Sequence, residues 1–328
     1  MSGISRSQKR SILLKLISSS TPLGPMSFRE VLHAGGFSVL EEAIREPAGL
    51  SPSSPAHEKL VELFTDYLFT GGMPEAVAVS AGNRSVSDAR EVHRSIISTY
   101  QNDFSKYHTK ISSEIILKVF NHVPLHLGEK VKYAHIVKDK PASIVREAIE
   151  ALINARVLLP ARHSSCTGVP LRVCSNENIF KLYFLDVGLA LYQSGTKWSD
   201  LKESANYLIQ KGNIAEQFTA QHLAYSSGGL EPPELYYWLR EGKSTNAEVD
   251  FVINHCGTIM PIEIKAGAAG SLRSLFQFAA HSKINRVVRF DLNPPSQQQI
   301  HTSIQTAEGQ KEVIRNHFVK IFLKIMKA

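Results

Sequence analysis

Residues 246–266 read NAEVDFVINHCGTIMPIEIKA, and this stretch decides how the rest of the chain is interpreted. Two runs of alternating apolar and polar residues flank Cys256-Gly257, which predicts two antiparallel strands joined by a two-residue turn. With that turn, Asp250 stands directly opposite Glu263. Lys265 follows Glu263 by two positions and therefore shares its face of the strand. The pattern predicts a carboxylate pair and a lysine on one face of a hairpin.

Two facing carboxylates need a cation, a proton or solvent, because like charges about 5 Å apart across a strand pair cost stability. Asp250, Glu263 and the backbone carbonyl of Ile264 are oxygen ligands of the kind that Mg²⁺ or Mn²⁺ takes, and Lys265 is suited to orient or help deprotonate an attacking water. The sequence therefore predicts a metal site for phosphodiester cleavage. The alternative is a half-exposed strand pair whose polar face meets water. An odd-length turn would separate the two carboxylates and remove the prediction.

The segments around the hairpin predict a mixed α/β unit. Residues 208–224 have apolar side chains at helical spacing, and 234–240 read as a strand. Residues 271–282 read as a second helix and 286–290 as a further strand. With the hairpin, the order is helix, strand, strand, strand, helix, strand, which is typical of an α/β unit with a mixed sheet.

This order, with Glu216 in the first helix, Asp250, the Glu263-Ile264-Lys265 triplet and Gln277 in the second helix, resembles the PD-(D/E)xK restriction-nuclease-like fold. More narrowly, the chain is similar to the C-terminal region of predicted prokaryotic AAA-type ATPases, the domain-of-unknown-function-4143 proteins. The landmarks that carry this resemblance are Pro25–Leu32, Tyr67–Val77, Tyr100–Asp103, Lys181–Leu189, Gly212–Glu216, Tyr236–Trp238, Glu248–Ile253 and Pro261–Lys265. The resemblance implies that Glu216 adds a carboxylate or orients the waters of the metal, and that Gln277 assists.

The chain departs from that family because it contains no G-x-x-x-x-G-K-[ST] phosphate loop. Gly242-Lys243-Ser244 is no substitute, since Tyr237 stands where the first glycine belongs and the triplet leads into a strand instead of a helix. We therefore expect no ATP site and no ATP hydrolysis by this chain alone. A truncated gene product, a subunit with a separate ATPase partner and a stand-alone derivative are the alternatives.

Most of the surplus positive charge lies in residues 106–181, which hold twelve Lys or Arg and six acidic residues in a chain of net charge +7. Helical patterns at 112–122, 133–137 and 143–155, the last with Ser143 as N-cap, precede two apolar runs at 157–161 and 171–174 that flank a polar loop. Three helices followed by a hairpin predict a winged-helix-like module.

In such a module the third helix often enters the major groove of DNA. Lys138 and Lys140 lie just before this helix and Arg146 lies within it, so these three residues are the expected phosphate contacts. The alternative is that the module binds protein or packs beside a neighbour. In that case Arg146, Glu147 and Glu150 form a solvated face.

The expected fold class is α/β (α+β) in four parts. Residues 1–50 are expected to be a remnant of an ATPase module with a linker, 51–110 a helical segment, 111–178 the winged-helix-like module and 179–328 the nuclease-like domain, a mixed sheet flanked by helices. Three cysteines without metal-site spacing indicate free thiols, and no apolar run approaches 18 residues, so we expect a cytoplasmic protein without a membrane span.

Two functions follow from these features. The first is a Mg²⁺- or Mn²⁺-dependent nuclease that acts on DNA, with Asp250 and Glu263 as metal ligands and Lys265 as the group that positions water. The second is a non-catalytic subunit that binds DNA or protein and works with a separate ATPase. The intact carboxylate and lysine set favours the first, and the missing phosphate loop favours the second.

Overall fold

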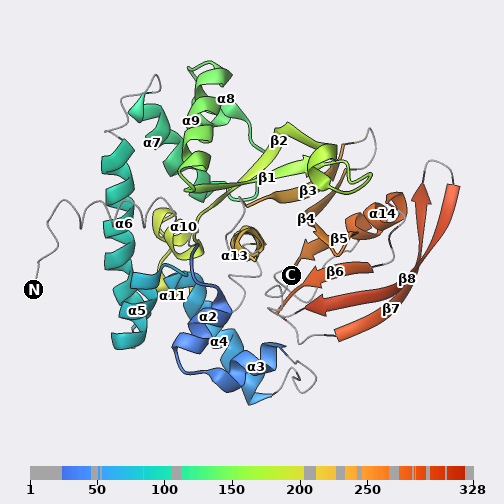
Figure 1. The fold of residues 1–328 in the computed structure, drawn as a ribbon, viewed down its shortest axis with the longest axis horizontal. Helices are drawn as coiled ribbons and strands as arrows, with labels where there is room; N and C mark the ends of the chain where they lie inside the picture. The colour runs from blue at the N-terminus through green and yellow to red at the C-terminus, as the bar shows by residue number, and fades with distance from the viewer. Residues whose placement is uncertain are drawn as a thin grey trace, which may run out of the picture.

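The computed structural model describes residues 24–45, 51, 54–83, 85–104, 112–202, 212–226, 233–241, 246–265, 273–282, 284, 286–292, 296–306 and 309–321. A helical part and a part built on one mixed sheet lie side by side (Figure 1). Helix α13 (Gly212–Tyr225) is seen end-on between the two parts. The mixed α/β class expected from the sequence is confirmed.

The helical part starts at the N-terminal end of the described chain. Its elements are α2 (Phe28–Ala34), α3 (Ser38–Arg45), α4 (Pro55–Thr70), α5 (Pro74–Asn83), η2 (Val86–Asp88) and α6 (Ala89–Phe104). Helix α4 lies in the predicted helical segment at 51–110 and starts where the Ser54 side chain accepts a hydrogen bond from the His57 N–H. Its apolar face packs on α13, where the Phe64 and Phe218 rings meet edge to face at 4.9 Å.

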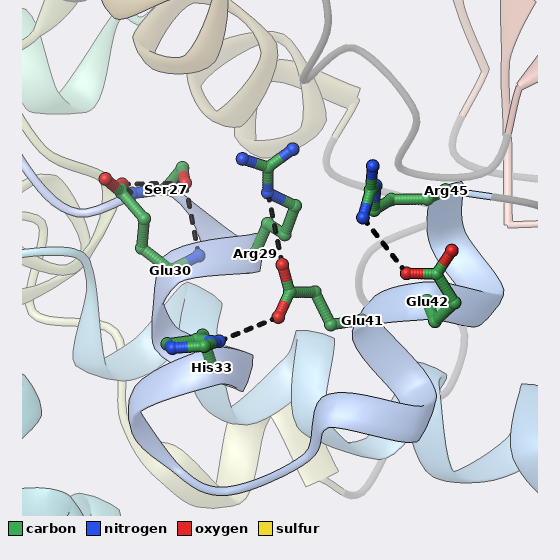
Figure 2. A network of polar contacts seen from close by, with 7 residues as sticks. All are labelled: Ser27, Arg29, Glu30, His33, Glu41, Glu42 and Arg45. Atoms are coloured by element: carbon green, nitrogen blue, oxygen red, sulfur yellow. Dashed lines mark hydrogen bonds and ion pairs between the residues drawn. The ribbon is translucent and has the colours of Figure 1, made fainter.

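Polar contacts on the surface join α2 to α3. Glu41 of α3 lies between Arg29, at 3.6 Å, and His33, at 3.0 Å, both on α2 (Figure 2). At the start of α2, Ser27 and Glu30 form a capping box in which each side chain bonds the backbone N–H of the other. Because exposed ion pairs each contribute about 1 kcal/mol or less, the capping box is expected to stabilise α2 at least as much as the Glu41 pairs do.

Replacing Ser27 with alanine is expected to lower the free energy of unfolding by about 1 kcal/mol, because the first turn of α2 loses its side-chain acceptor. Urea denaturation followed by circular dichroism measures this loss. Ser143→Ala is the matched control: Ser143 is exposed inside a helix and caps nothing, so alanine should be neutral or slightly stabilising there. Equal losses in the two variants would contradict a capping role for Ser27.

The three helices predicted before the hairpin are present, with ends that differ by a residue or so. They are α7 (Ser113–His122), which η3 (Val123–Leu125) extends, α8 (Tyr133–Ile136) and α9 (Ala142–Asn154). The predicted N-cap of the third helix is wrong. Helix α9 begins one residue earlier, with Pro141 in the N-cap position and no side-chain capping bond, because proline suits the extended backbone just before a helix.

The second strand of the hairpin predicted to follow these three helices does not lie at 171–174. Strand β1 (Leu158–Ser164) is where it was expected, but Leu171–Cys174 is a 3-10 turn, η4, and β2 is Ser175–Phe184. In a strand, Leu171 and Val173 would share one face, yet Leu171 is buried and Val173 is 79% exposed. The predicted domain boundary at 178/179 falls inside β2, and β1 also pairs with β3, so this hairpin is part of the main sheet.

The main sheet contains the order of elements predicted around the hairpin at residues 246–266. Strands β3 (Leu235–Arg240), β4 (Ala247–His255) and β5 (Thr258–Ile264) are antiparallel neighbours, and β6 (Arg286–Phe290) runs parallel to β5. The full strand order is β2-β1-β3-β4-β5-β6-β8-β7, with β7 (Ser296–Thr306) and β8 (Gly309–Ile321) at one edge. The predicted helix at 208–224 corresponds to α13, and residues 208–211 lie outside the described residues.

Helices cover both faces of this sheet. Ala220 and Ala224 of α13 pack on one face, against a layer that includes Tyr237, Phe251 and Ile262. Helix α14 (Arg273–His281) packs on the other face, against Trp238, Val249 and Val287 among others. We refer to these as the α13 face and the α14 face. None of the helices in the described part of the chain has the length and apolar character needed to cross a membrane.

A buried polar junction fastens the helical part to α13. Asp186 caps the start of α10 (Val187–Gln193), which α11 (Trp198–Lys202) follows. Its carboxylate accepts hydrogen bonds from the N–H groups of Gly72, at 2.6 Å, and Leu189, at 3.0 Å, and from Gln221 of α13, at 3.4 Å. Burial raises the pKa of Asp186 to about 6, although these hydrogen bonds oppose the shift.

Candidate functional site

The hairpin from which the site is built has the predicted turn. His255 pairs with Thr258, so Cys256 and Gly257 form a two-residue turn, and both have positive φ, at 50° and 77°. Such a turn matches the twist of the strands that it joins. Phe251 pairs with Ile262, which is the register that the predicted two-residue turn requires.

The prediction that Asp250 and Glu263 share one face of the hairpin is wrong. Tyr236 pairs with Val252 and Trp238 with Val249, so β4 has an extra residue in a bulge that contains Asp250 and Phe251. A bulge changes the alternation of side chains, and it turns Asp250 toward the α13 face, together with Phe251.

Glu263 alternates with Ile262 and Ile264, which pack on the α13 face, so its side chain starts from the α14 face, where Arg289 is its partner on β6. The two carboxylates therefore come from different faces, although the charge of Asp250 still acts on Glu263. We call Asp250, Glu263, Ile264 and Lys265 the rim group.

The rim group is joined by short contacts. Asp250 Oδ2 accepts a hydrogen bond from the backbone N–H of Ile264 at 2.7 Å. Lys265 Nζ lies 2.6 Å from Glu263 Oε1, whereas Glu263 Oε2 is buried and has no hydrogen-bond partner. Lys265 itself is 29% exposed, so solvent reaches this end of the sheet.

The pKa values in the rim group reflect burial and mutual repulsion. Burial, and then the charge of Asp250, raise the pKa of Glu263 to about 7, although the bond from Lys265 opposes the shift. Burial also raises the pKa of Asp250, against the effects of Lys181 and of the Ile264 N–H. Burial is the largest effect on Lys265 and lowers its pKa, but the bond to Glu263 and the charges of Glu263 and Asp250 together outweigh it, so the pKa is raised. The rim group thus has two carboxyl groups and one ammonium, and the raised pKa values show that a further positive charge would be favourable there.

Glu216 belongs to a second group, on the α13 face. It accepts a hydrogen bond from the Tyr183 hydroxyl at 2.9 Å and lies 3.6 Å from Lys181 Nζ, and Lys181 also pairs with Glu248. We call Lys181, Tyr183, Glu216 and Glu248 the Lys181 cluster. Burial, and then the charge of Asp250, raise the pKa of Glu216 to about 8, so Asp250 connects the two groups electrostatically.

The remaining predicted site residues lie farther out. Gln277 is 8% exposed on α14 and accepts a hydrogen bond from Arg240 Nη2 at 3.4 Å. Lys138 and Lys140 are exposed between α8 and α9. Arg146 is exposed on α9, where it bonds Glu150 at 2.8 Å and Asn178 at 3.3 Å. The Gly242-Lys243-Ser244 triplet lies outside the described residues.

Sequence reasoning missed the Lys181 cluster apart from Glu216. Lys181 interrupts the apolar run at 179–184 and is 3% exposed, and a lysine is seldom buried unless it is paired. Glu248 precedes Asp250 by two residues, a spacing that places two carboxylates on one side of a strand. Those two signals were present in the sequence, but nothing in it indicated that β2 would lie near β4.

The donor set suits a small, hydrated divalent ion. In the part of the chain that the structure describes, no group of three or more His, Cys, Asp or Glu side chains is arranged to hold a metal. Mg²⁺ does not need such a cage, because it keeps several waters and is usually held by one or two carboxylates. The buried oxygen of Glu263 without a partner, on which the charge of Asp250 acts, fits that requirement.

Two family models match this chain. A domain of unknown function (DUF8612) matches residues 61–200, and a domain of unknown function (DUF4143) matches residues 211–307. Comparisons with curated proteins and with solved structures gave no match. The DUF4143 match agrees with the resemblance stated from the sequence and contains the whole rim group with Glu216 and Gln277, whereas Lys181 and Tyr183 lie in the other match.

Proposed function

We propose that this protein is a Mg²⁺- or Mn²⁺-dependent nuclease that cleaves phosphodiester bonds of DNA at the rim group. Three observations at the end of β5 support this most: the Ile264 N–H holds the Asp250 carboxylate, Lys265 pairs with Glu263, and a buried Glu263 oxygen has no partner. The order of elements around them, from α13 through β3, β4, β5 and α14 to β6, agrees with a restriction-nuclease-like domain.

The residues of the rim group have separate roles in this proposal. Glu263 Oε2 and Asp250 hold the ion, with Asp250 kept in place by the Ile264 N–H. The N–H and C=O of one strand residue point toward the same neighbour, so the Ile264 carbonyl faces the Asp250 side and completes the set. When bound, the metal would polarise a phosphoryl oxygen and lower the pKa of a water.

Lys265 is the cation that reaches solvent in the rim group. Its ammonium is ion-paired with Glu263 Oε1 in this structure. It is suited to orient the attacking water or to offset negative charge that develops on the phosphate. Glu216 acts from the Lys181 cluster instead of as a direct ligand, because Tyr183 and Lys181 already occupy Oε2. Gln277 assists from α14 next to Arg240.

The basic surface gives DNA a place to dock. Lys138 and Lys140 are exposed before α9, and the chain carries a net charge of +7, so phosphate contacts at this module would hold DNA mainly by salt-sensitive attraction. Arg146 contributes less, since Glu150 pairs with it. A separate ATPase is the partner that the absent phosphate loop suggests.

A second candidate is a non-catalytic subunit that binds DNA or protein and works with a separate ATPase. One observation favours it: Lys265 is already ion-paired with Glu263 at 2.6 Å, and this pair compensates much of the rim charge without a metal. In that case the rim group stabilises the end of the sheet, and the protein works by binding alone.

Manganese titration by calorimetry tests the nuclease proposal. Asp250→Asn is expected to lower the affinity for Mn²⁺ at least tenfold, because it removes an anionic ligand, whereas Glu177→Gln, on the exposed part of β2, should not change it. The affinity should also rise with pH through about 7, since the metal must displace the proton that Glu263 holds more tightly than usual.

Cleavage of supercoiled DNA in the presence of Mg²⁺ completes the test. Lys265→Ala and Asp250→Asn should abolish nicking and leave the far-ultraviolet circular dichroism spectrum unchanged. If the protein does not bind Mn²⁺ at millimolar concentration and DNA binding survives both substitutions, the nuclease proposal is wrong and the binding subunit is favoured.

A further inference from the structure

Lys181 is a buried cation in the middle of a set of carboxylates. Its side chain is 3% exposed, its Nζ is paired with Glu248 Oε1 and lies 3.6 Å from Glu216 Oε2, and Asp250 is the next charge that acts on it. Nζ also lies 5.1 Å from the centre of the Tyr237 ring. Carboxylates from α13 and β4 thus converge on one ammonium that comes from β2.

The surrounding backbone leaves room for this long side chain and closes the cluster on another side. The residue paired with Lys181 on β1 is Ala161, whose methyl group does not obstruct a side chain that extends from β2 toward β4. Gly128 lies against Glu216: it has φ +74°, and a Cβ there would be 2.5 Å from Glu216 Oε2. The carboxylate of Glu216 is therefore confined between Gly128, Tyr183 and Lys181.

The charges explain what Lys181 does there. Glu216 and Asp250 are both partly buried, and a carboxylate that is removed from water needs a cation or a proton. A site that uses two divalent ions needs carboxylates for both of them. Here the rim group is open to a cation from solvent, whereas the second set of carboxylates already contains the ammonium.

We propose that Lys181 is a built-in counter-cation that takes the place of a second divalent ion between Glu216 and Glu248, so that the protein binds one metal ion and not two. The inference deepens the proposed nuclease function, and only the rim ion depends on that function. Lys181 is a positioning residue in this scheme, because it fixes Glu216 and Asp250 and does not contact the substrate.

Counting Mn²⁺ ions bound per chain tests the proposal. Wild type is expected to bind one ion, and Lys181→Met to bind two, because methionine has a similar length without the charge and leaves Glu216 and Glu248 to a metal. Lys181→Arg restores the cation and should return the number to one. The double variant Lys181→Met with Glu248→Gln should also return to one, since it lacks a ligand. Mn²⁺ should raise the melting temperature of Lys181→Met more than that of wild type.

The outcomes separate this proposal from the nuclease function. If wild type binds no ion and Lys181→Met binds one, the counter-cation role stands and the rim site is wrong. If Lys181→Met gains no ion although it is folded, the counter-cation role is wrong whatever the rim does. If Lys181→Met does not fold, electron paramagnetic resonance of wild type with excess Mn²⁺ decides. A spectrum of isolated Mn²⁺ ions supports the proposal, and a spectrum of two spin-coupled Mn²⁺ ions overturns it.

Discussion

Replacing Gly72 with alanine is expected to destabilise this protein by at least about 4 kcal/mol, a loss large enough to unfold most domains. A Cβ at this position would lie 2.1 Å from the Met26 carbonyl oxygen and 2.8 Å from the Met26 nitrogen. Both atoms belong to the backbone, so no side chain can rotate to relieve the clash. Urea denaturation followed by circular dichroism measures the effect, together with the yield of soluble protein.

The clash is costly because it removes two buried contacts at once. The Met26 N–H donates to the Gly72 carbonyl at 2.6 Å, and the Gly72 N–H donates to Asp186 at 2.6 Å. Moving the chain by the width of a methyl group would break both bonds and leave the Asp186 carboxylate short of a donor inside the protein. The segment before α2, the end of α4 and the start of α10 would then separate.

Gly82→Ala is the matched control for Gly72→Ala. Gly82 lies in α5, and a Cβ there meets nothing within 4 Å, so alanine should leave the stability unchanged or raise it by up to about 1 kcal/mol. Equal urea midpoints for the two variants would show that the Gly72 contact does not exist. Gly71→Ala should resemble Gly72→Ala, because Gly71 has φ +72° and its Cβ would meet the Asp186 carboxylate at 2.1 Å.

Local sequence signals predicted the elements of this fold better than their contacts. The helical patterns at 112–122, 133–137 and 143–155 are examples, because they are present as α7, α8 and α9. No such local pattern shows that the Gly72 N–H meets Asp186, because the two residues are 114 positions apart and the glycine carries no side chain to indicate a partner.

The candidate site was predictable in register but not in detail. Cys256-Gly257 indicated the turn because two-residue hairpin turns need positive φ, which glycine adopts without cost. The bulge at Asp250 was harder to see, since its signal is only the interruption of alternation where Phe251 and Val252 are both apolar. That one extra residue turns Asp250 toward Lys181 and Glu216 and away from the face of Glu263, and a prediction based on strict alternation cannot include it.

Lys181 shows a second kind of limit. A lysine in an apolar strand can be exposed at an edge or buried with a partner, and only the partner distinguishes these cases. Its partners, Glu216 and Glu248, come from elements that follow later in the chain and are brought near by the pairing of β1 with β3. Packing of the whole sheet therefore determines this cluster, and spacing within any one segment does not.

The second large effect is expected at His222, which ties α13 to the start of α2. His222 Nε2 accepts a hydrogen bond from the Phe28 N–H at 3.0 Å, and Nδ1 lies 2.8 Å from the Phe218 carbonyl oxygen. These partners require a neutral ring with its proton on Nδ1, since a proton on Nε2 would point at the Phe28 N–H. Burial lowers the pKa of His222 to about 4, against the effect of the Phe218 carbonyl.

The lowered pKa determines how the contribution of His222 to stability changes with pH. Above pH 6.5 the ring is neutral in folded and unfolded chains, and the contribution of His222 to stability is complete. Between 6.5 and about 4, the unfolded chain binds a proton that the folded chain does not, so this contribution is lost as the pH falls. A shift of this size corresponds to about 3 kcal/mol.

His222→Gln is expected to remove this dependence on acid. Glutamine keeps an acceptor for the Phe28 N–H but does not titrate, so the variant should be less stable than wild type at pH 7.5 and should recover by about 3 kcal/mol relative to wild type on going to pH 4. The difference in unfolding free energy between variant and wild type, measured by urea denaturation at several pH values, isolates His222 from Asp186 and Glu216, whose raised pKa values act in the opposite direction.

His135→Gln, at an exposed position in α8, is the control, and its difference from wild type should stay flat over the same range. A flat difference for His222→Gln as well would mean that the ring is already accessible to protons in the folded chain. The contact between α2 and α13 would then be open in solution, and the first described helix would not be fastened to the part of the chain that carries the rim group.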